Sequence, residues 1–286
     1  VLSNLMQFSG YHVTREYYIN DAGSQITTLS KSAFIRYLEA LGEELEAIPD
    51  GFYPGDYLIE VGRFLADNYG DSLKQLSEDE ITDRIGPIAV DLMMQSIRKD
   101  LERLGIVMDI YSSENQLVKK GKVSSAMQKL KSDNLIYRGK PEPPKGKLDK
   151  DWEPREQLLF RSKEFGDDVD RPLQKSDDSW TYFASDVAYH YDKLERTDGR
   201  LIDVLGADHS GYVKRMTAAV QAISGKKDML QIKQCGLVSL LDKGKPVKMS
   251  KRAGTFVTLS DVIDAVSAYV MRFVMLTRRN DQPLEF

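Results

Sequence analysis

Residues 200–216 read RLIDVLGADHSGYVKRM, and this stretch decides the fold class. Its apolar run Leu201–Leu205 is typical of a buried strand, and the pattern of Tyr212–Ile223 is that of a helix. The same alternation is predicted around it: a strand over Trp180–Ala184, a helix over Asp186–Leu194, and a strand or hairpin arm over Ile232–Leu241. Strands that alternate with helices indicate an α/β fold with a parallel sheet.

The composition favours a globular protein of one large domain or two ordinary ones. The chain has 286 residues, of which 41% are hydrophobic and 29% charged. No apolar stretch approaches the roughly 18 residues of a membrane span. The single Cys235 excludes an internal disulfide framework and is predicted to be a buried, reduced thiol. The net charge of −4 argues against nucleic acid over the whole surface but permits a local basic groove.

Ligands of parallel α/β sheets bind beyond the carboxyl ends of the strands, so the loops after Ala184, Leu205 and Leu241 are predicted to share one crevice. The first candidate segment there is Tyr182-x-x-x-Asp186. A phenol and a carboxylate at a strand-to-helix junction suit a guanidinium, which pairs bidentately with a carboxylate. In the alternative interpretation, Asp186 only caps its helix and Tyr182 packs.

The second candidate segment is Gly206-Ala207-Asp208-His209. Glycine lets a ligand approach the backbone, and the Asp-His pair could contact ribose hydroxyls or phosphate. The alternative is a capped helix start with a structural histidine. With three histidines in the chain, metal-ligand clusters are not expected, and no metal site is predicted. The acidic run with Asp167, Asp168 and Asp170 lacks the spacing of a calcium loop and is interpreted as a solvated turn.

The third candidate segment is Lys248-Met249-Ser250-Lys251-Arg252, which Gly254 follows. Three cations within five positions can surround a phosphate chain, with the serine hydroxyl as a further donor. Most short basic runs are solvated surface, so the charge pattern alone leaves both interpretations open.

Taken together, these segments resemble the bacterial type of arginyl-tRNA synthetase, a class I aminoacyl-tRNA synthetase. The resemblance covers nearly the whole chain. It rests on the following segments: GYHVTREYYINDAGSQI, YPGDYLIEV, KPEPPKGK, DWEPREQLLFRS, FGDDVDRPLQKSDDSWTYFASDVAYH, RLIDVLGADHSGYVKRM, VKMSKRAGTFVTLSDVID and FVMLTRRNDQPLEF. It implies a Rossmann-type catalytic core that carries a mostly helical insertion.

The resemblance also implies a reaction and its partners. L-arginine would be activated with ATP and Mg²⁺ to arginyl-adenylate, and the arginyl group would pass to the terminal adenosine of tRNA(Arg). A monomer in the cytoplasm is expected. Tyr182 and Asp186 match the family's contacts to the arginine side chain, and His209 falls where some members place a glutamine near the substrate.

The same resemblance assigns the ATP contacts. Gly206 and Asp208 match the segment that lines the ATP pocket, and Lys248, Met249, Ser250, Lys251 and Arg252 match the signature loop. Attack of a carboxylate on the α-phosphate builds negative charge on the phosphorus and the leaving pyrophosphate, which fixed cations stabilise. Lys251 and Lys248 are therefore the expected catalytic residues.

One departure from the family concerns its other ATP signature, His-x-Gly-His. The histidines here are His12, His190 and His209, and no pair of them has that spacing. The core is thus expected to be incomplete at its N-terminus, with the anticodon-binding domain beyond Phe286, and the chain alone is expected to be nearly inactive. The expected parts are a first Rossmann segment at 1–42, the helical insertion and linker at 43–154, a second Rossmann segment at 155–258, and a helical connection at 259–286.

Two other classes of protein remain possible on the sequence. One is a noncatalytic truncated paralogue that binds arginine or nucleotide, and the other is a different ATP-dependent nucleotidyl-transferring Rossmann enzyme. An open reading frame that extends upstream through His-x-Gly-His would favour the ligase over the paralogue. Specificity for arginine would count against the second alternative.

Overall fold

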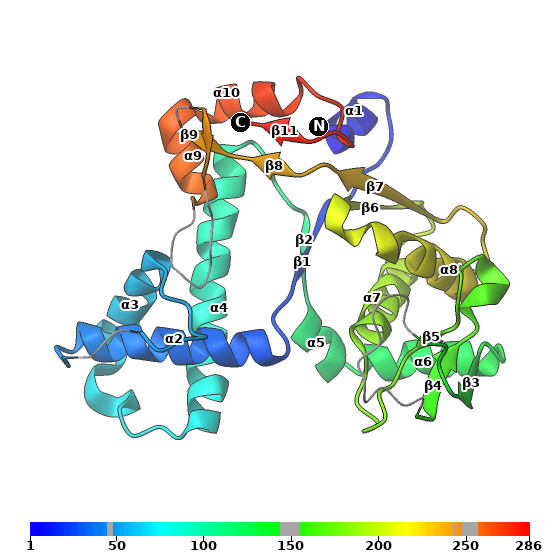
Figure 1. The fold of residues 1–286 in the computed structure, drawn as a ribbon, viewed down its shortest axis with the longest axis horizontal. Coiled ribbons are helices and arrows are strands. Elements are labelled where there is room, and N and C mark those ends of the chain that lie inside the picture. The colour runs from blue at the N-terminus through cyan, green and yellow to red at the C-terminus, as the bar shows by residue number, and fades with distance from the viewer. Residues whose placement is uncertain (45–47, 144–154, 243, 248–256) are drawn as a thin grey trace. The chain divides into compact units, whose positions relative to one another are not determined.

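The computed structural model describes residues 1–44, 48–143, 155–242, 244–247 and 257–286. The chain forms two compact units (Figure 1). The first comprises Val1–Tyr111, Ser239–Arg278 and Glu285–Phe286, and the second comprises Ser112–Val238 and Arg279–Leu284. The short strands β2 (Ile110–Ser113), β8 (Val238–Ser239) and β11 (Leu284–Glu285) span the residues at which the chain passes between the units.

The first unit is mostly helical. Its elements are α1 (Leu2–Phe8), β1 (Glu16–Ile19), α2 (Ser24–Ala40), η1 (Asp56–Leu58), α3 (Ile59–Tyr69), η2 (Gly70–Leu73), α4 (Glu78–Arg103), β9 (Leu241–Asp242), β10 (Lys245–Pro246), α9 (Leu259–Val266) and α10 (Ala268–Met275). Helices α2, α3 and α4 enclose a core that includes Tyr37, Leu65 and Ile85, each fully buried. A Cβ atom at Gly62 of α3 would collide with the backbone carbonyl of Arg36 in α2, so this close approach of two helices requires glycine.

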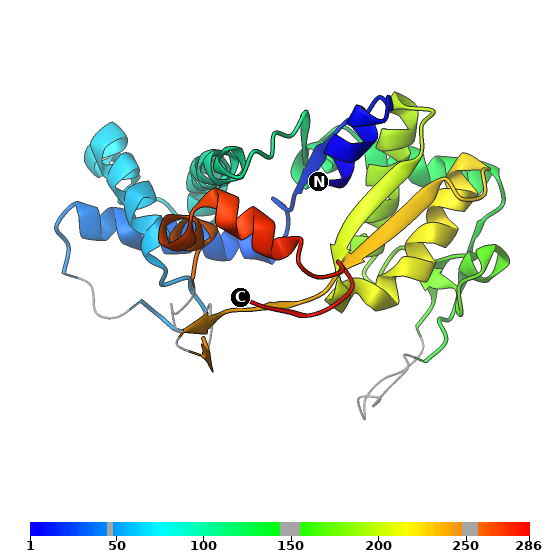
Figure 2. The same ribbon diagram turned by 90° about the horizontal axis from the view of Figure 1, so that it is seen from above.

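The second unit contains the parallel part of the fold. Its elements are α5 (Glu114–Lys119), α6 (Lys122–Ser132), β3 (Ile136–Gly139), β4 (Gln157–Phe160), η3 (Ser162–Phe165), β5 (Arg171–Pro172), α7 (Tyr182–Arg196), β6 (Leu201–Gly206), η4 (Ala207–Tyr212), α8 (Val213–Ser224) and β7 (Leu230–Cys235). Strands β6 and β7 pair in parallel from Leu201↔Leu230 to Gly206↔Cys235, and they lie side by side in Figure 2. The expected β–α–β alternation is therefore present in this unit.

The core of the second unit joins this parallel pair to α6, α7 and α8, with Phe160 of β4 and Met216 of α8 fully buried among them. Strands β3, β4 and β5 form a separate antiparallel sheet. The prediction that Leu201–Leu205 is buried is wrong at Val204, which is 62% exposed. Side chains alternate along a strand, and Asp203 bonds to α7, so Val204 faces the opposite side of the sheet.

Two other expectations for this unit need correction. Cys235 is a free thiol, but it is only half-buried, at the carboxyl end of β7 opposite Gly206. The acidic run is not simply solvated, because the Asp167 side chain is buried. It accepts two hydrogen bonds of 2.6 Å from Arg171 and one of 2.8 Å from Ser162. A buried carboxylate is stable only with such partners. Asp168 pairs with the amine of Lys214 at 2.8 Å.

A capping box at Ser77 begins α4, as the Ser77-x-x-Glu80 spacing predicts. The Ser77 hydroxyl accepts a hydrogen bond from the Glu80 amide, and the Glu80 carboxylate accepts one of 2.9 Å from the Ser77 amide. We expect Ser77→Ala to lower the free energy of unfolding of the first unit by about 1 kcal/mol, because the Glu80 amide loses its acceptor, the Ser77 hydroxyl.

Denaturant unfolding and amide hydrogen exchange in the first turn of α4 measure this loss. Ser96→Ala, at an exposed position farther along the same helix, is the matched control. Its hydroxyl bonds only to the Leu92 carbonyl within the helix, so little change is expected. Equal stability of the two variants would show that the capping box contributes nothing.

Candidate functional site

Helix α7 carries the first candidate segment. Tyr182 is its first residue, and the Thr181 hydroxyl caps the helix by accepting a hydrogen bond from the Ala184 amide at 3.3 Å. The expected strand over Trp180–Ala184 is therefore wrong, and Ala184 lies inside a helix rather than before a loop. Because Thr181 is the cap, the interpretation of Asp186 as a helix cap is also wrong. Tyr182 and Asp186 are one turn apart on α7, with Tyr182 67% exposed.

The Asp186 carboxylate is partly buried and receives a hydrogen bond from the hydroxyl of Tyr212, at the end of η4. Burial raises the pKa of Asp186 above its usual range, and the bond from Tyr212 and the charge of His190 offset only part of that rise. No cation lies within ion-pair distance of this carboxylate among the residues that the structure describes. Asp186 is thus a desolvated acid that is still without a counter-cation.

A second carboxylate nearby, Asp203 of β6, is compensated fully. His190 Nε2 lies 2.8 Å from one of its oxygens, and the Lys193 amine donates to the other at 3.1 Å. Burial alone would raise the pKa of Asp203, but the bonds from His190 and Lys193 hold it well below its usual range. His190 Nδ1 donates to the Asp186 carbonyl at 2.7 Å. Both ring nitrogens therefore face oxygen atoms, one of a carbonyl and one of a carboxylate.

These two carboxylates belong to one hydrogen-bond network, but they differ in their ability to bind a further cation. Asp203 already has two basic partners, His190 and Lys193, and its side chain is only 12% exposed. Asp186 has a phenol as its hydrogen-bond donor and a pKa that burial raises. A ligand cation would relieve the unfavourable environment of Asp186, whereas the charge of Asp203 already has partners within the protein. The arrangement is suited to binding a guanidinium or an ammonium group at Asp186.

The second candidate segment lies at the carboxyl end of β6. Gly206 ends the strand, and Asp208 and His209 lie in η4, with 3.6 Å between their carboxylate and imidazole groups. Both side chains are more than half exposed. No side chain caps η4, so the alternative of a capped helix start is not what the structure has. A Cβ atom at Gly206 would meet only the end of the mobile Asp208 side chain, so packing alone does not require glycine there.

Element η4 therefore connects two of the three predicted segments. It carries Asp208 and His209 and supplies Tyr212 to Asp186 on α7. The third segment, Lys248-Met249-Ser250-Lys251-Arg252, lies outside the described residues. Before it, β9 and β10 form an antiparallel hairpin with Asp242 opposite Lys245.

Sequence reasoning missed four residues of the site: Tyr212, His190, Lys193 and Asp203. One signal was available, since Tyr182, Asp186 and His190 recur every four residues and must share one stripe of a helix. A polar stripe that runs beside the apolar residues of a helix indicates polar partners elsewhere in the fold. The partners themselves, Asp203 and Tyr212, could not be identified from spacing because they lie on other elements.

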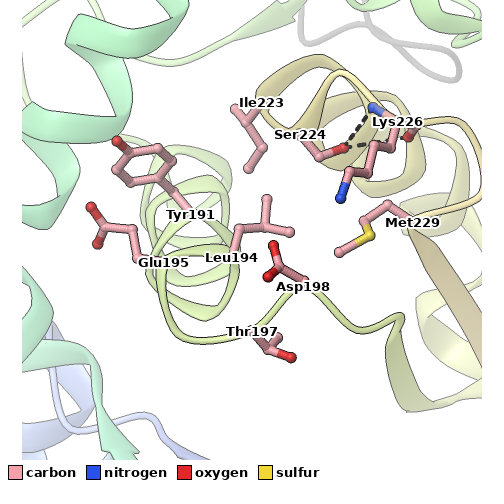
Figure 3. Close-up of a pocket in the computed structure, with 9 residues that line it drawn as sticks. All are labelled: Tyr191, Leu194, Glu195, Thr197, Asp198, Ile223, Ser224, Lys226 and Met229. Carbon is pink, nitrogen blue, oxygen red and sulfur yellow. Dashed lines mark hydrogen bonds between the residues drawn. The ribbon is translucent and has the colours of Figure 1, made fainter.

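A pocket of about 230 Å³ lies at the other ends of the same helices (Figure 3). Its walls come from the last turns of α7 and α8 and the loops that follow them, with Leu194, Ile223 and Met229 turned toward one another and with Asp198 and Lys226 beside them. Strands β6 and β7 begin on this side and end at Gly206 and Cys235. Because ligands of such sheets bind at the carboxyl ends, this pocket is not the candidate substrate site.

The described residues show no cluster of three metal-ligating side chains and no helix long and apolar enough to cross a membrane.

The pairing at Asp203 generates a prediction about acid stability. A carboxyl group with a lowered pKa contributes stability above its unfolded pKa, about 3.9, and loses that contribution as the pH falls toward its folded pKa. We expect Asp203→Asn to lower the melting temperature at pH 7. The difference from the wild type should shrink as the pH falls below about 4, because both proteins then lack the charge in the unfolded state.

Thermal unfolding of both proteins between pH 7 and pH 3.5 measures this difference. Asp198→Asn, on the loop after α7, is the control and should leave the melting temperature nearly unchanged. A constant difference between wild type and Asp203→Asn across the pH range would contradict the assignment.

Comparison with known proteins identifies the family. Residues 1–282 match the family model described as tRNA synthetases class I (R), catalytic domain. A protein of Ruegeria pomeroyi named arginine–tRNA ligase is 56% identical over 285 residues, and one of Roseobacter denitrificans with the same name is 58% identical. Each alignment covers 100% of this chain and 49% of the relative. The chain thus spans about half the length of the curated relatives it matches.

Solved structures agree with this match. A Campylobacter jejuni structure described as an arginyl tRNA synthetase has a TM-score of 0.83 and 31% identity, covering 100% of this chain and 58% of that one. Methionyl-tRNA synthetase of Mycobacterium tuberculosis, at 12% identity and a TM-score of 0.51, shares the fold alone, over 96% of this chain and 66% of that one. The α/β fold, the segments around α7 and η4 and these matches together show that the chain belongs to the family of class I arginyl-tRNA synthetase catalytic domains.

Proposed function

We propose that the protein containing this chain is an arginine–tRNA ligase. It activates L-arginine with ATP to arginyl-adenylate and transfers the arginyl group to the 3′-terminal adenosine of tRNA(Arg). The relatives that carry this name align with the whole of this chain at 56–58% identity. We further infer that it acts as a monomer in the cytoplasm, as the family resemblance implies.

The observation that carries the proposal is the environment of Asp186. Arginine differs from most amino acids by a planar cation with five N–H donors, which a carboxylate accepts bidentately. Asp186 offers a partly buried carboxylate that has no cationic partner among the described side chains. The neighbouring basic side chains of His190 and Lys193 are held by Asp203 instead. A guanidinium at Asp186 would therefore complete a charge balance that the protein leaves open.

The other contacts are assigned by their positions around Asp186. Tyr182 lies one turn before it at the exposed start of α7, where its phenol can cover the side chain of the substrate. His209 lies in η4, the element whose Tyr212 contacts Asp186, and we assign it to the same substrate. Gly206 and Asp208 lie at the carboxyl end of β6, where nucleotides bind in parallel α/β sheets, and we assign them to ATP.

The chemical step is assigned to the signature loop, on sequence alone. Lys248 and Lys251 would neutralise the charge that develops on the α-phosphate and the leaving pyrophosphate, with Ser250 as an added donor and Met249 and Arg252 completing the ATP contact. Mg²⁺ would accompany the ATP phosphates, as it does for most nucleoside triphosphates bound by enzymes. These five residues lie outside the described part of the chain.

Asp186→Asn tests the arginine site. The substitution turns a charge-assisted hydrogen bond into a neutral one, so we expect the KM for arginine to rise by roughly 30- to 150-fold, which corresponds to about 2–3 kcal/mol. The KM for ATP should change little. Steady-state pyrophosphate exchange and aminoacylation by the natural protein measure both constants. Asp198→Asn, at the far ends of α7 and β6, serves as the same substitution away from the site. An unchanged KM for arginine would overturn the role of Asp186.

Lys251→Ala tests the signature loop. An interaction made mainly in the transition state affects kcat more than ground-state binding. We therefore expect the rate of adenylate formation to fall by roughly 100-fold or more, the cost of losing one preorganised donor, while the KM for ATP stays near that of the wild type. Rapid-quench measurement of adenylate formation reports the chemical step, with Lys226→Ala as the control. An unchanged rate would remove Lys251 from the mechanism.

A further inference from the structure

We propose that Tyr212 is a positioning residue for the Asp186 carboxylate, and that its hydroxyl sets the affinity of the site for the guanidinium group of the substrate. The inference rests on the proposed function, in which Asp186 receives the arginine side chain. It assigns a role to a residue that does not belong to any of the three predicted segments.

The Tyr212 hydroxyl donates directly to Oδ2 of Asp186. The ring is held from two sides. Phe183, 5% exposed, meets it edge-on with 6.4 Å between ring centroids and 86° between the planes, and the Arg215 guanidinium lies 5.1 Å from its centroid. Such aromatic and cation–π contacts fix a ring in position. The donor that reaches Asp186 is therefore rigid.

The guanidinium of Arg215 lies in an unfavourable environment, which indicates that its position over the Tyr212 ring matters. Burial lowers the pKa of its guanidinium, and the nearby Arg171 charge lowers it further. Its buried Nε has no hydrogen-bond partner in the described part of the chain. An unsatisfied polar atom is tolerated in few places in a protein. The contact with the Tyr212 ring is a favourable interaction of this side chain, and the nearby charge of Asp167 is another.

A fixed hydroxyl is useful because a carboxylate has a broad terminal torsion. Bidentate pairing with a guanidinium requires both oxygens in one plane facing the ligand, and a free carboxylate pays entropy to adopt that plane. One hydrogen bond to Oδ2 selects the plane in advance. It does not use up the acceptor capacity, since the two oxygens of a carboxylate offer about four lone-pair sites. Tyr212 thus orients Asp186 without blocking it.

The opposite role is also conceivable: Tyr212 could occupy Asp186 only while the substrate is absent. The two roles predict opposite changes in arginine binding when Tyr212 is removed. If Tyr212 positions the carboxylate, its removal weakens arginine binding. If it competes with the substrate, its removal strengthens binding. The geometry favours positioning, because Phe183 and Arg215 hold the ring in place and a competing group must be able to leave.

The bond also affects the pH at which Asp186 is ionised. The groups that face Asp186 are His190 and Lys193 from α7, Asp203 from β6 and Tyr212 from η4. Burial raises the pKa of Asp186 most, and the bond from Tyr212 is the largest influence that lowers it. A guanidinium binds to the ionised form of Asp186. Binding is therefore present above the pKa of Asp186 and is lost below it. Removing the hydroxyl raises the pKa and moves the acidic limb of arginine binding to higher pH.

Tyr212→Phe in the natural protein tests the proposal. We expect the KM for arginine to rise by about tenfold, as for the loss of one hydrogen bond to a charged group, while the KM for ATP stays unchanged. The acidic limb of 1/KM for arginine should move to higher pH, because the hydrogen bond that lowers the pKa of Asp186 is lost. Tyr191→Phe is the matched control. It makes the same change on α7, and Tyr191 lines the pocket at the other end of the helix (Figure 3).

An unchanged or lower KM for arginine in Tyr212→Phe, or an unmoved acidic limb, overturns the proposal. Asp186→Asn separates this failure from that of the proposed function. If Asp186→Asn raises the KM and Tyr212→Phe does not, only the role of Tyr212 is lost, whereas no effect from either variant removes the arginine site as well. If Tyr212→Phe does not fold, Arg215→Met replaces it and should raise the KM in the same direction by a smaller factor, and no rise would overturn the proposal.

Discussion

A carboxylate in the middle of β6 fixes the position of α7 in the second unit. Asp203 takes one partner from each of two turns of that helix, His190 and Lys193, and all three side chains are mostly buried. Because uncompensated charges are costly away from water, the helix cannot slide or rotate against the strand without breaking both pairs. The second nitrogen of the His190 ring bonds to the Asp186 carbonyl and so connects this constraint to the next turn toward the helix start.

The candidate site follows from that constraint. With the two cations taken by Asp203, Asp186 remains on the same helix stripe with only a phenol as its donor. Its desolvation and its lack of a cation both come from the packing of α7, β6 and η4, and both favour binding of a cationic side chain. Strand β6 leads directly into η4, which also carries Asp208 and His209. One short element thus brings the candidate arginine and nucleotide contacts of this unit together.

Several features were predictable because they depend on local chemistry. The capping box at Ser77, the helix over residues 24–40 and the strand that ends at Gly206 follow from patterns that need no distant partner. The strand expected over Trp180–Ala184 failed for the complementary reason. Its aromatic and β-branched residues favour a strand, but the Thr181 cap and the burial of Phe183 and Ala184 in the core draw the segment into α7. Asp167 was expected in solvent, and Arg171, four residues away, made its burial possible.

The sequence by itself determined the family, the α/β alternation of the second unit and the candidate residues Tyr182, Asp186, Gly206, Asp208 and His209, because motif and periodicity are properties of neighbouring residues. The assignment of Lys248 to Arg252, and the expected boundaries at 42, 154 and 258, also rest on sequence. Only the tertiary structure decided which acid is compensated. Asp203 and Asp186 are both single aspartates in apolar surroundings, and their difference arises from His190, Lys193 and Tyr212, which reach them across elements. Electrostatic environment depends on distances in space, and sequence spacing does not record these.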